Sequence, residues 1–493
     1  MSSTQQTPAA GSTLVERLDA LYEYDREPVA KNKLHGWKTF IAMFSGEHVA
    51  GTEFLLGPLM VMHGVSAPDF FIGLLIGNIL AVLSWALLCA PVAVKVRLTI
   101  YWQLRKICGP YLTIAYSGFY AVILCLLAGS MVSVAVTAIS IPFDIPNPNY
   151  LAGDVLPTFP WMVLALIVGV VIAALAVLGF DKIAHFSKVC APWMVLVFFA
   201  CGLAVLADLG TTGFSDFWRV MNEKIFTGVP LGDNSKYTMW HVAGFAWLCN
   251  GTQHIGMSDV TIFRYAKDWK QGFSSAFGMF LGHYMAWIAS GILCAAYLAE
   301  GFTNPQPGDI AMFGAGFAGL ICVVIAGWTT ANPTLYRAGL AIQVATPNWK
   351  RWKVTFLAGA AMIVAACIPA VNAYLDRIIG YYGLFFMPLG AFIFVDVWLF
   401  PKLGLISDYA EKKGLLLSWP AAVAWFGSFA IMLFFYGKDN YPWLTKLLGQ
   451  QPDWLASIQA DLLFMVAPEW VLCVLLYIGF SKIQQRNDKL ETA

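Results

Sequence analysis

Polar side chains of the kind that bind solutes and ions occur twice inside long apolar segments of this chain. Glu47 and His48 form the first pair, and Gln253 and His254 follow at an offset of 206 positions. The same offset matches other residues: Thr52 with Ser258, and Glu53 with Asp259. Polar interruptions at matching places in two halves of an apolar chain are typical of transporters built from an internal repeat with broken helices.

Glycines flank both pairs: Gly46, Gly51, Gly251 and Gly256. We expect both helices to open there, because unwound backbone inside a membrane is tolerated where it lines a cavity or is buried in protein. An opened helix presents N–H groups from one half and C=O groups from the other. The first suit an anion or acceptor and the second a cation. A solute and a coupling ion can therefore share one break.

Each polar side chain has a functional and a structural interpretation. Glu47 either accepts N–H donors from a solute or carries a proton, or it binds backbone N–H groups that the break releases. His48 and His254 either contact the solute or tie the two helices together. Gln253 suits an amide-like edge, and Asn250 lies at the edge of the second break. Two further acids, Glu53 and Asp259, are expected to be structural and to pair with donors at helix ends or in loops.

A third polar feature lies in the eighth apolar segment, where Thr329 and Thr330 are adjacent. Hydroxyl and carbonyl oxygens are hard ligands for a small cation. The alternative is that each hydroxyl bonds back to the preceding helical turn.

The composition makes this a membrane protein. The 493 residues are 59% hydrophobic and 12% charged, whereas soluble domains carry about 25% charged residues. The formal net charge of +1 favours neither nucleic acid nor an acidic partner. Residues 1–34 are polar and predict a cytosolic tail rather than a signal peptide.

A membrane-spanning helix needs about 20 apolar residues, and on that criterion the chain has twelve. We predict spans near 36–63, 68–94, 109–141, 158–180, 184–208, 238–263, 272–299, 310–343, 353–374, 378–400, 416–436 and 460–481. With the N-terminus inside, the interior loops hold fifteen Lys and Arg residues and the exterior loops six. This asymmetry places both termini in the cytoplasm, and the inner (plasma) membrane is the expected location.

Several motifs resemble the nucleobase–cation symporter family, especially its cytosine-permease branch. The resemblance covers most of residues 30–400. It rests on five stretches: 328–330, 335–340, 76–80, 259–267 and 388–396, the first reading Trp-Thr-Thr. That family is similar to the inverted-repeat sodium symporters. It implies an all-α membrane fold with a five-plus-five inverted repeat, broken helices one and six, and two further helices. The expected organisation is a tail (1–34), a first repeat (35–210), a second repeat (211–405) and helices eleven and twelve with a C-terminal tail (406–493).

The resemblance also implies where the ligands bind. Sodium would lie between helices one and eight, held by the carbonyls of Phe44, Glu47 and Ala326 and by the hydroxyls of Thr329 and Thr330. The solute would lie between helices one, three, six and eight, and family members sandwich a planar ring between aromatic residues of helices three and six.

The chain departs from the family pattern in its aromatic and amide residues. In helix three the nearest aromatics are Phe119 and Tyr120, and in helix six Trp247 lies one turn before the expected position, which Asn250 occupies. The asparagine that commonly follows the two threonines comes one place later, as Asn332. Together with the buried Glu47, this favours a solute rich in N–H donors, or a cation, over a uracil-like ring.

The sequence therefore predicts a secondary-active importer of a small nitrogen-rich solute, coupled to sodium, with no covalent chemistry and no cofactor. The alternative is a proton-coupled transporter of a guanidinium- or ammonium-type cation. A membrane enzyme is disfavoured because Glu47 and His48 do not have the His-Glu-x-x-His spacing of a helical metal site. A channel or solute sensor is disfavoured because mid-membrane breaks favour a gated site over a pore.

Overall fold

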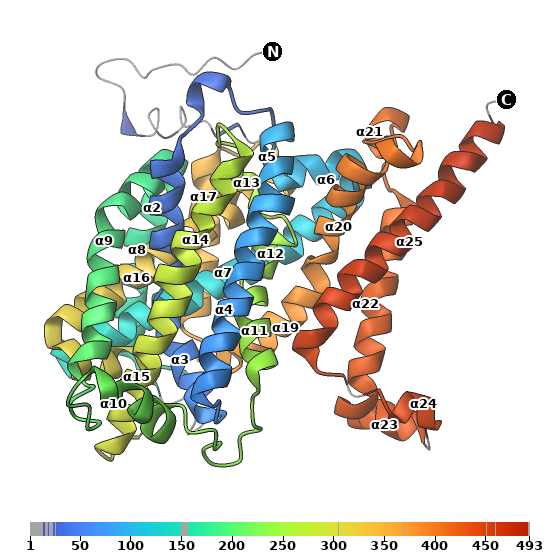
Figure 1. Cartoon of the computed structure of the whole chain (residues 1–493). Helices are drawn as coiled ribbons and strands as arrows, with labels where there is room; N and C mark the ends of the chain where they lie inside the picture. The colour runs from blue at the N-terminus through green and yellow to red at the C-terminus, as the bar shows by residue number, and fades with distance from the viewer. Residues whose placement is uncertain are drawn as a thin grey trace.

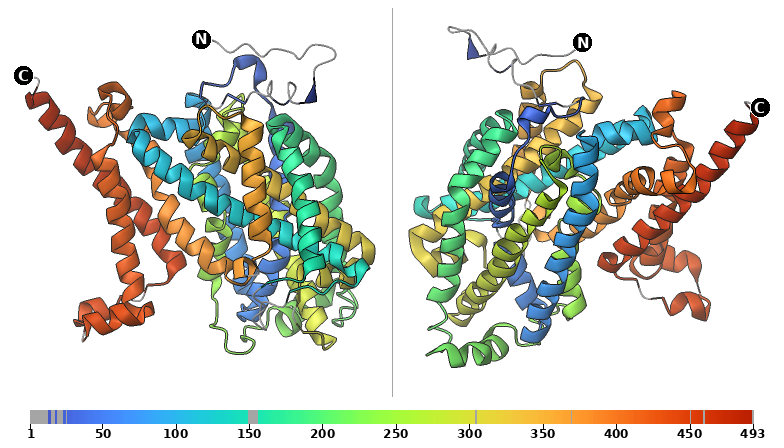
Figure 2. Two further views of the ribbon diagram at one scale, coloured as in Figure 1. Left: turned by 180° about the vertical axis from the view of Figure 1, so that it is seen from behind. Right: turned by 45° about the horizontal axis from the view of Figure 1, so that its top comes forward.

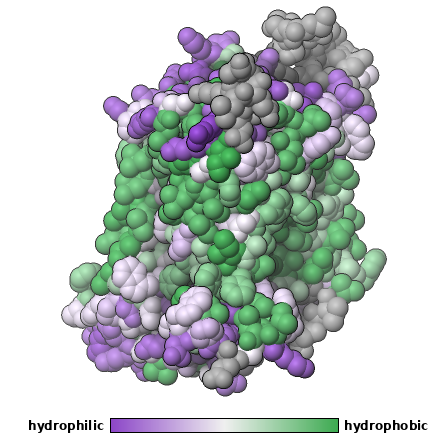
Figure 3. Space-filling view, turned by 90° about the vertical axis from the view of Figure 1, so that its right-hand side faces the viewer, coloured by the Kyte–Doolittle hydropathy of each residue, from purple (hydrophilic) through white to green (hydrophobic). Residues whose placement is uncertain are grey.

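The computed structural model describes residues 13–14, 18, 23–24, 26–148, 156–303, 305–368, 370–449, 451–458 and 460–491. These residues form helices and turns, with isolated bridges joining His35 to Ala266 and Ser66 to Thr227. Space-filling atoms show a broad apolar band between two polar ends (Figure 3). The chain is thus an all-helical, multi-pass membrane protein.

Nine of the described helices are long and apolar enough to cross a membrane. They are Ala67–Val96, Pro110–Phe143, Phe159–Val177, Phe180–Ala204, Trp269–Ala299, Pro307–Ala345, Arg377–Leu399, Trp419–Asn440 and Leu462–Arg486. Each corresponds to one predicted span, with ends that differ by a few residues.

The other three predicted spans contain shorter helices. Span 36–63 holds α2 (Trp37–His48) and α3 (Glu53–Met62). Span 238–263 holds α11 (Met239–Leu248), α12 (Gly251–His254) and α13 (Val260–Phe263). Span 353–374 holds α17 (Arg351–Ala366) and α18 (Ala370–Ala373). The first two are short because the backbone leaves the helix where the polar residues lie.

The broken helices are enclosed by longer ones. The long helices α7 (Pro110–Ser140) and α16 (Pro307–Ala345) pack along each other. The half-helix α3 packs on α15 (Met285–Ala299), and α11 packs on α4 (Ala67–Ser84). The half-helix α2 contacts α16 and α9 (Phe180–Ala204). Side chains from the breaks therefore face packed helices rather than lipid.

Two helices stand at one edge of the molecule. α22 (Trp419–Asn440) and α25 (Leu462–Glu491) pack on each other and slant away from the remaining helices in every view (Figures 1 and 2). α25 reaches the bundle through α19 (Leu375–Phe386) and α20 (Pro388–Phe394). The start of α2 and the end of α25 lie at the same end of the molecule (Figure 1).

The remaining elements are the span α8 (Phe159–Val177), short helices and helical turns of altered pitch. The short helices are α5 (Ala90–Val96), α6 (Ile100–Cys108), α10 (Phe214–Val220), α14 (Ser275–Gly278), α21 (Tyr409–Lys413), α23 (Pro442–Leu448) and α24 (Asp453–Ala456). Three π-helical turns, η2 (Trp85–Cys89), η6 (Met279–Tyr284) and η7 (Val395–Leu399), belong to long helices of the described chain, and a fourth, η4 (Met221–Ile225), follows α10. α16 is interrupted at Ala315–Gly316, where Gly316 takes the left-handed φ of 56° that its missing side chain permits.

Candidate functional site

The first break lies between α2 and α3. α2 ends at His48. The turn that follows is closed by a hydrogen bond from the Glu53 N–H to the Ala50 carbonyl oxygen, with an N–O distance of 3.1 Å. Gly51 lies in this turn, as expected. Gly46 does not, because α2 continues through it. A Cβ at position 46 would lie 2.8 Å from the Cβ of Ser187, so this glycine serves close packing and the prediction that it opens the helix was wrong.

The second break has two parts. α11 ends at Leu248, α12 begins at Gly251, and the chain leaves the helix again before α13. In the second part Met257 takes a left-handed φ of 61°, and the Asp259 N–H donates to the Gln253 carbonyl at 3.0 Å. A left-handed non-glycine residue is rare and costs energy. This strained turn brings the Asp259 carboxylate back toward α16.

Arg337 of α16 joins the two breaks. Its Nη1 lies 2.6 Å from Glu47 Oε1 at the end of α2, and its Nη2 lies 2.5 Å from Asp259 Oδ1. Its Nε donates to the same Asp259 oxygen at 3.1 Å, and its Nη2 also donates to Glu47 Oε2 at 3.3 Å. All three side chains are buried. The planar guanidinium suits this two-carboxylate geometry.

The charges of this cluster do not balance when all three groups are ionised, because two carboxylates face one guanidinium. A buried charge is tolerated when it is paired and hydrogen-bonded. The other donors supply hydrogen bonds but no charge: Trp85 Nε1 reaches Asp259 Oδ2 at 2.8 Å, and Gln253 Nε2 reaches Glu47 Oε1 at 3.4 Å. The cluster therefore favours the presence of one more positive charge, on an ion, a proton or a solute.

Oxygen atoms gather beside this cluster. Thr330 Oγ1 lies 2.9 Å from the carbonyl oxygen of Glu47 and 2.9 Å from that of Ala326. Thr329 Oγ1 lies 3.2 Å from the same Ala326 carbonyl and 3.1 Å from that of Ile325. The structure thus brings four predicted cation ligands together. Both hydroxyls also bond back to their own helix, as the structural alternative requires, but Thr330 reaches across to α2 as well. The Phe44 carbonyl faces His48 Nδ1 at 3.1 Å.

Another buried acid, Glu53, lies just after the first break. Glu53 accepts a hydrogen bond from the indole N–H of Trp287, and its Oε1 lies 3.7 Å from His283 Nε2. The arrangement parallels the second break, where the indole of Trp85 donates to Asp259. In each case the acid follows one break, and the tryptophan comes from the long helix that follows the other break in the chain, within or just after a π-helical turn. The two breaks share this local architecture.

The structure places six predicted solute-binding residues at or beside the breaks. Glu47 and Gln253 contact each other, and Asn250 Nδ2 lies 3.0 Å from His283 Nε2. His254 Nε2 lies 2.8 Å from the Trp247 carbonyl. The rings of His48 and His254 both lie against Trp85, with centroids 5.5 Å and 4.5 Å away.

Three other predicted solute-binding residues differ in their placement. Tyr120 is buried, and its hydroxyl donates to Thr252 Oγ1 of α12 at 3.4 Å. Phe119 does not join the site: its side chain is 55% exposed and packs edge-on against Phe385, because adjacent positions on α7 face different sides. Asn332 is fully buried in α16, and its amide has no hydrogen-bond partner within the described part of the chain.

Sequence reasoning missed the residues that bind these acids: Arg337, Trp85, Trp287 and His283. Arg337 carries a signal of its own, because an arginine inside an apolar span marks a functional site by default. The two tryptophans carry none, since indoles in membrane proteins are most often interfacial anchors.

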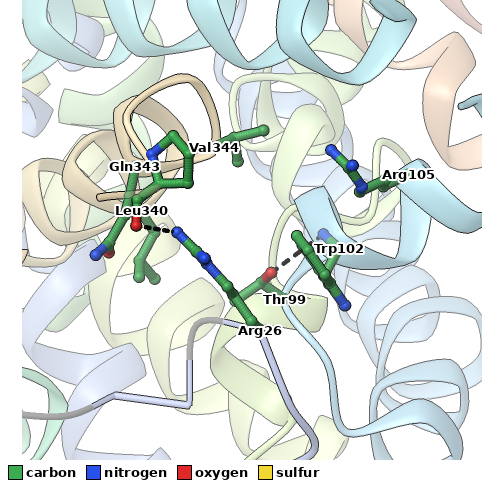
Figure 4. A pocket seen from close by; sticks show the side chains of 8 residues that line it. Arg26, Thr99, Trp102, Arg105, Leu340, Gln343 and Val344 are labelled. Atoms are coloured by element: carbon green, nitrogen blue, oxygen red, sulfur yellow. Dashed lines mark hydrogen bonds between the residues drawn. The ribbon is translucent and has the colours of Figure 1, made fainter. Parts of the chain in front are cut away.

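A pocket of about 170 Å³ lies elsewhere, between the N-terminal segment, α6 and the end of α16 (Figure 4). It is lined by Arg26, Thr99, Trp102, Arg105, Leu340, Gln343, Val344 and Pro347. Arg26 donates to the Pro347 carbonyl there. This lining includes none of the predicted site residues, so the pocket is separate from the breaks.

No protein-family model matches the chain, and no curated protein matches it in sequence. Solved structures do match. The nucleobase-cation-symport-1 family transporter Mhp1, closed with bromovinylhydantoin bound, matches with a TM-score of 0.68 at 15% identity, over 93% of this chain and 94% of Mhp1. The inward-facing conformation of Mhp1 matches with a TM-score of 0.64 at 14% identity, over 95% of both chains.

A Na⁺-coupled sialic acid symporter in its substrate-bound outward-open state matches with a TM-score of 0.60 at 13% identity, over 91% of this chain and 89% of the symporter. At these identities the similarity establishes the fold, which is that of Mhp1.

Proposed function

We propose that this chain is a secondary-active symporter that imports a small nitrogen-rich solute together with sodium, by alternating access. In this proposal the chain crosses the membrane twelve times. The first ten spans form a five-plus-five inverted repeat that is divided near residue 210. Two features support the repeat: the matched breaks, and the tryptophan that binds the acid after each break. Both termini are cytoplasmic.

The observation that carries the proposal is the position of Thr330. Its hydroxyl lies 2.9 Å from carbonyl oxygens of α2 and α16 at once. A sodium ion bound by these oxygens and by Thr329 would hold the end of α2 against α16. Its charge would also offset the excess negative charge of the Glu47–Arg337–Asp259 cluster. Ion binding would therefore favour the arrangement in which the first broken helix is docked.

The solute in this proposal binds beside the ion, against Glu47, Gln253 and Asn250. A carboxylate and two amides present several acceptors to a solute with many N–H groups. Mhp1 has a hydantoin bound, and a hydantoin ring also carries N–H donors and carbonyls.

The test is uptake by the full chain in proteoliposomes. We expect a labelled nucleobase, ureide or guanidinium compound to accumulate with an inward sodium gradient. Thr330→Ala should lower sodium-driven uptake at least tenfold. Thr334→Ala is the matched control, because this threonine is also buried in α16 but its hydroxyl donates at 2.9 Å to the Thr330 carbonyl of its own helix. Uptake that ignores sodium and survives Thr330→Ala would refute sodium coupling.

The excess negative charge of the Arg337 cluster favours a second candidate, a proton-coupled transporter of a cationic solute. A solute with one positive charge would balance the cluster without sodium. In the same vesicles a pH gradient would then drive uptake of guanidinium compounds, and a sodium gradient would not.

A further inference from the structure

Glu53 differs from the other acids at the breaks in having no fixed cation. Glu47 and Asp259 share Arg337, whereas within the described residues no lysine or arginine pairs with Glu53. Its side chain is buried, with Oε2 accepting from the Trp287 indole and Oε1 lying 3.7 Å from His283 Nε2. A bare carboxylate in such a place is strongly disfavoured, so the pair requires a proton.

His283 is equally enclosed. It lies in the π-helical turn η6, a local geometry that is frequent at functional sites. The turn reaches the first break because Gly282 carries no side chain: a Cβ there would lie 2.2 Å from the His48 carbonyl oxygen. Besides Glu53, the titratable groups near His283 are Cys249, with Sγ 3.9 Å from Nδ1, His48, with its ring 5.5 Å away, and His254. The Trp287 ring stacks on the His283 imidazole, with the two ring centroids 5.4 Å apart.

Asn250 connects this pair to the second break. Its Nδ2 lies 3.0 Å from His283 Nε2. This contact is a hydrogen bond when the amide donates and Nε2 accepts, which is the arrangement with a neutral His283 and the proton of the pair on Glu53. When the proton moves, the Glu53 O–H bond breaks and an N–H bond forms at His283 Nε2. The histidine then donates, and Asn250 must present Oδ1 or turn away.

We propose that Glu53 and His283 form a proton-binding site, and that the position of its single proton decides which atom Asn250 presents at the second break. Both positions keep the pair neutral overall, as a neutral acid with a neutral imidazole or as a carboxylate with an imidazolium. Loss of the proton leaves a buried, unpaired carboxylate, so the site exchanges its proton with water when the break is open. Only the consequence for solute binding rests on the proposed function.

Infrared spectroscopy of the full chain in lipid vesicles tests the site without any solute. Subtracting the Glu53→Gln spectrum from the wild-type spectrum in acidic buffer should leave a carbonyl band of a protonated carboxylic acid. Glu469→Gln is the matched control. Glu469 is fully buried in α25, away from the breaks, with Ser428 Oγ at 3.5 Å. That variant should keep the Glu53 band.

His283→Gln gives an independent result if Glu53→Gln does not fold. It should keep the carboxylic acid band of Glu53, change the pH dependence of that band, and remove any imidazolium band that exchanges with it. A carboxylic acid band that Glu53→Gln leaves unchanged throughout the pH range overturns the proposal, as does a band with the same pH dependence in His283→Gln and in the wild type. Neither outcome depends on sodium-driven uptake, so failure of the site and failure of the transport proposal are distinguishable.

Discussion

Arg337 holds two carboxylates that come from different broken helices, and all three side chains are buried. Removing one partner of a buried ion pair leaves an uncompensated charge, which costs more than the pair itself contributes. Arg337 is therefore first of all a structural residue, which links the two broken helices. A solute or ion that binds the Glu47 carboxylate must either compete with this guanidinium or share the carboxylate with it.

We expect Arg337→Gln to lower the free energy of unfolding by about 3–5 kcal/mol, the range for breaking a buried pair. Arg337→Lys should cost less, because it keeps the charge but loses the fork geometry. Thermal unfolding of the purified variants in one detergent measures both. Arg219→Gln is the control, since Arg219 pairs with Glu223 at 3.3 Å on the exposed surface, where such pairs contribute about 0–1 kcal/mol. Equal stability of Arg337→Gln and Arg219→Gln would contradict this account of the cluster.

Residue identity predicted part of this site. Glu47, Gln253 and Thr330 stand out in the sequence because polar groups are expensive in apolar segments, and the structure brings them together. Their partners do not stand out in the same way. Arg337 is 290 positions from Glu47, and helical periodicity says nothing about which of several spans lies opposite a given face. Phe119 shows the converse error, since an aromatic residue in the right span can still face outward.

At the scale of elements, apolar length predicted nearly every helix, but the glycines had two different uses. Gly51 lies where the helix opens, whereas Gly46 and Gly282 allow helices to touch. Sequence alone cannot separate these uses, because both require the absence of a side chain. The neighbour decides: Ser187 faces Gly46, and the His48 carbonyl faces Gly282.

The contact between η6 and α2 gives a prediction for Gly282→Ala. Its new methyl group would lie 2.2 Å from a backbone oxygen, so one helix must move. We expect a loss of about 1–3 kcal/mol, typical of overpacking, measured by thermal unfolding. Gly118→Ala in α7 is the control, since a methyl group added there would have no atom within 4 Å. That variant should be neutral or gain up to about 1 kcal/mol through helix propensity. Similar losses in both variants would argue against a tight η6–α2 contact.

At the scale of the whole molecule, the N-terminal segment, here Glu23 and Tyr24, forms hydrogen bonds to several helices at one end. Glu23 Oε2 accepts from the hydroxyls of Tyr265 at 2.9 Å and Tyr336 at 3.0 Å, and its Oε1 accepts from the Phe180 N–H at 3.3 Å. Arg264 donates to the carbonyls of Glu23 at 2.7 Å and Tyr24 at 2.5 Å. The segment thereby joins the end of α13 to α16 and to the start of α9.

In the proposed alternating-access cycle, α13 and α16 would separate when a path opens at this end. The Glu23 carboxylate would oppose that separation, because it accepts hydrogen bonds from Tyr265, just after α13, and from Tyr336 of α16. We therefore expect Glu23→Ala to loosen the end of α13. Loss of one hydrogen bond to a charged group is worth about 1.5–3 kcal/mol, or roughly tenfold to a hundredfold in an opening equilibrium.

Hydrogen–deuterium exchange measured by mass spectrometry on the full chain in lipid checks this expectation. Amides of residues 260–266 should exchange roughly tenfold or more faster in Glu23→Ala than in the wild type. Tyr336→Phe should give a smaller change of the same sign, because it removes one of the two hydroxyls on Glu23 Oε2. Glu223→Ala, an exposed acid that pairs with Arg219, should leave these amides unchanged. If Glu23→Ala leaves the exchange rates of residues 260–266 unchanged, the N-terminal segment does not restrain the end of α13.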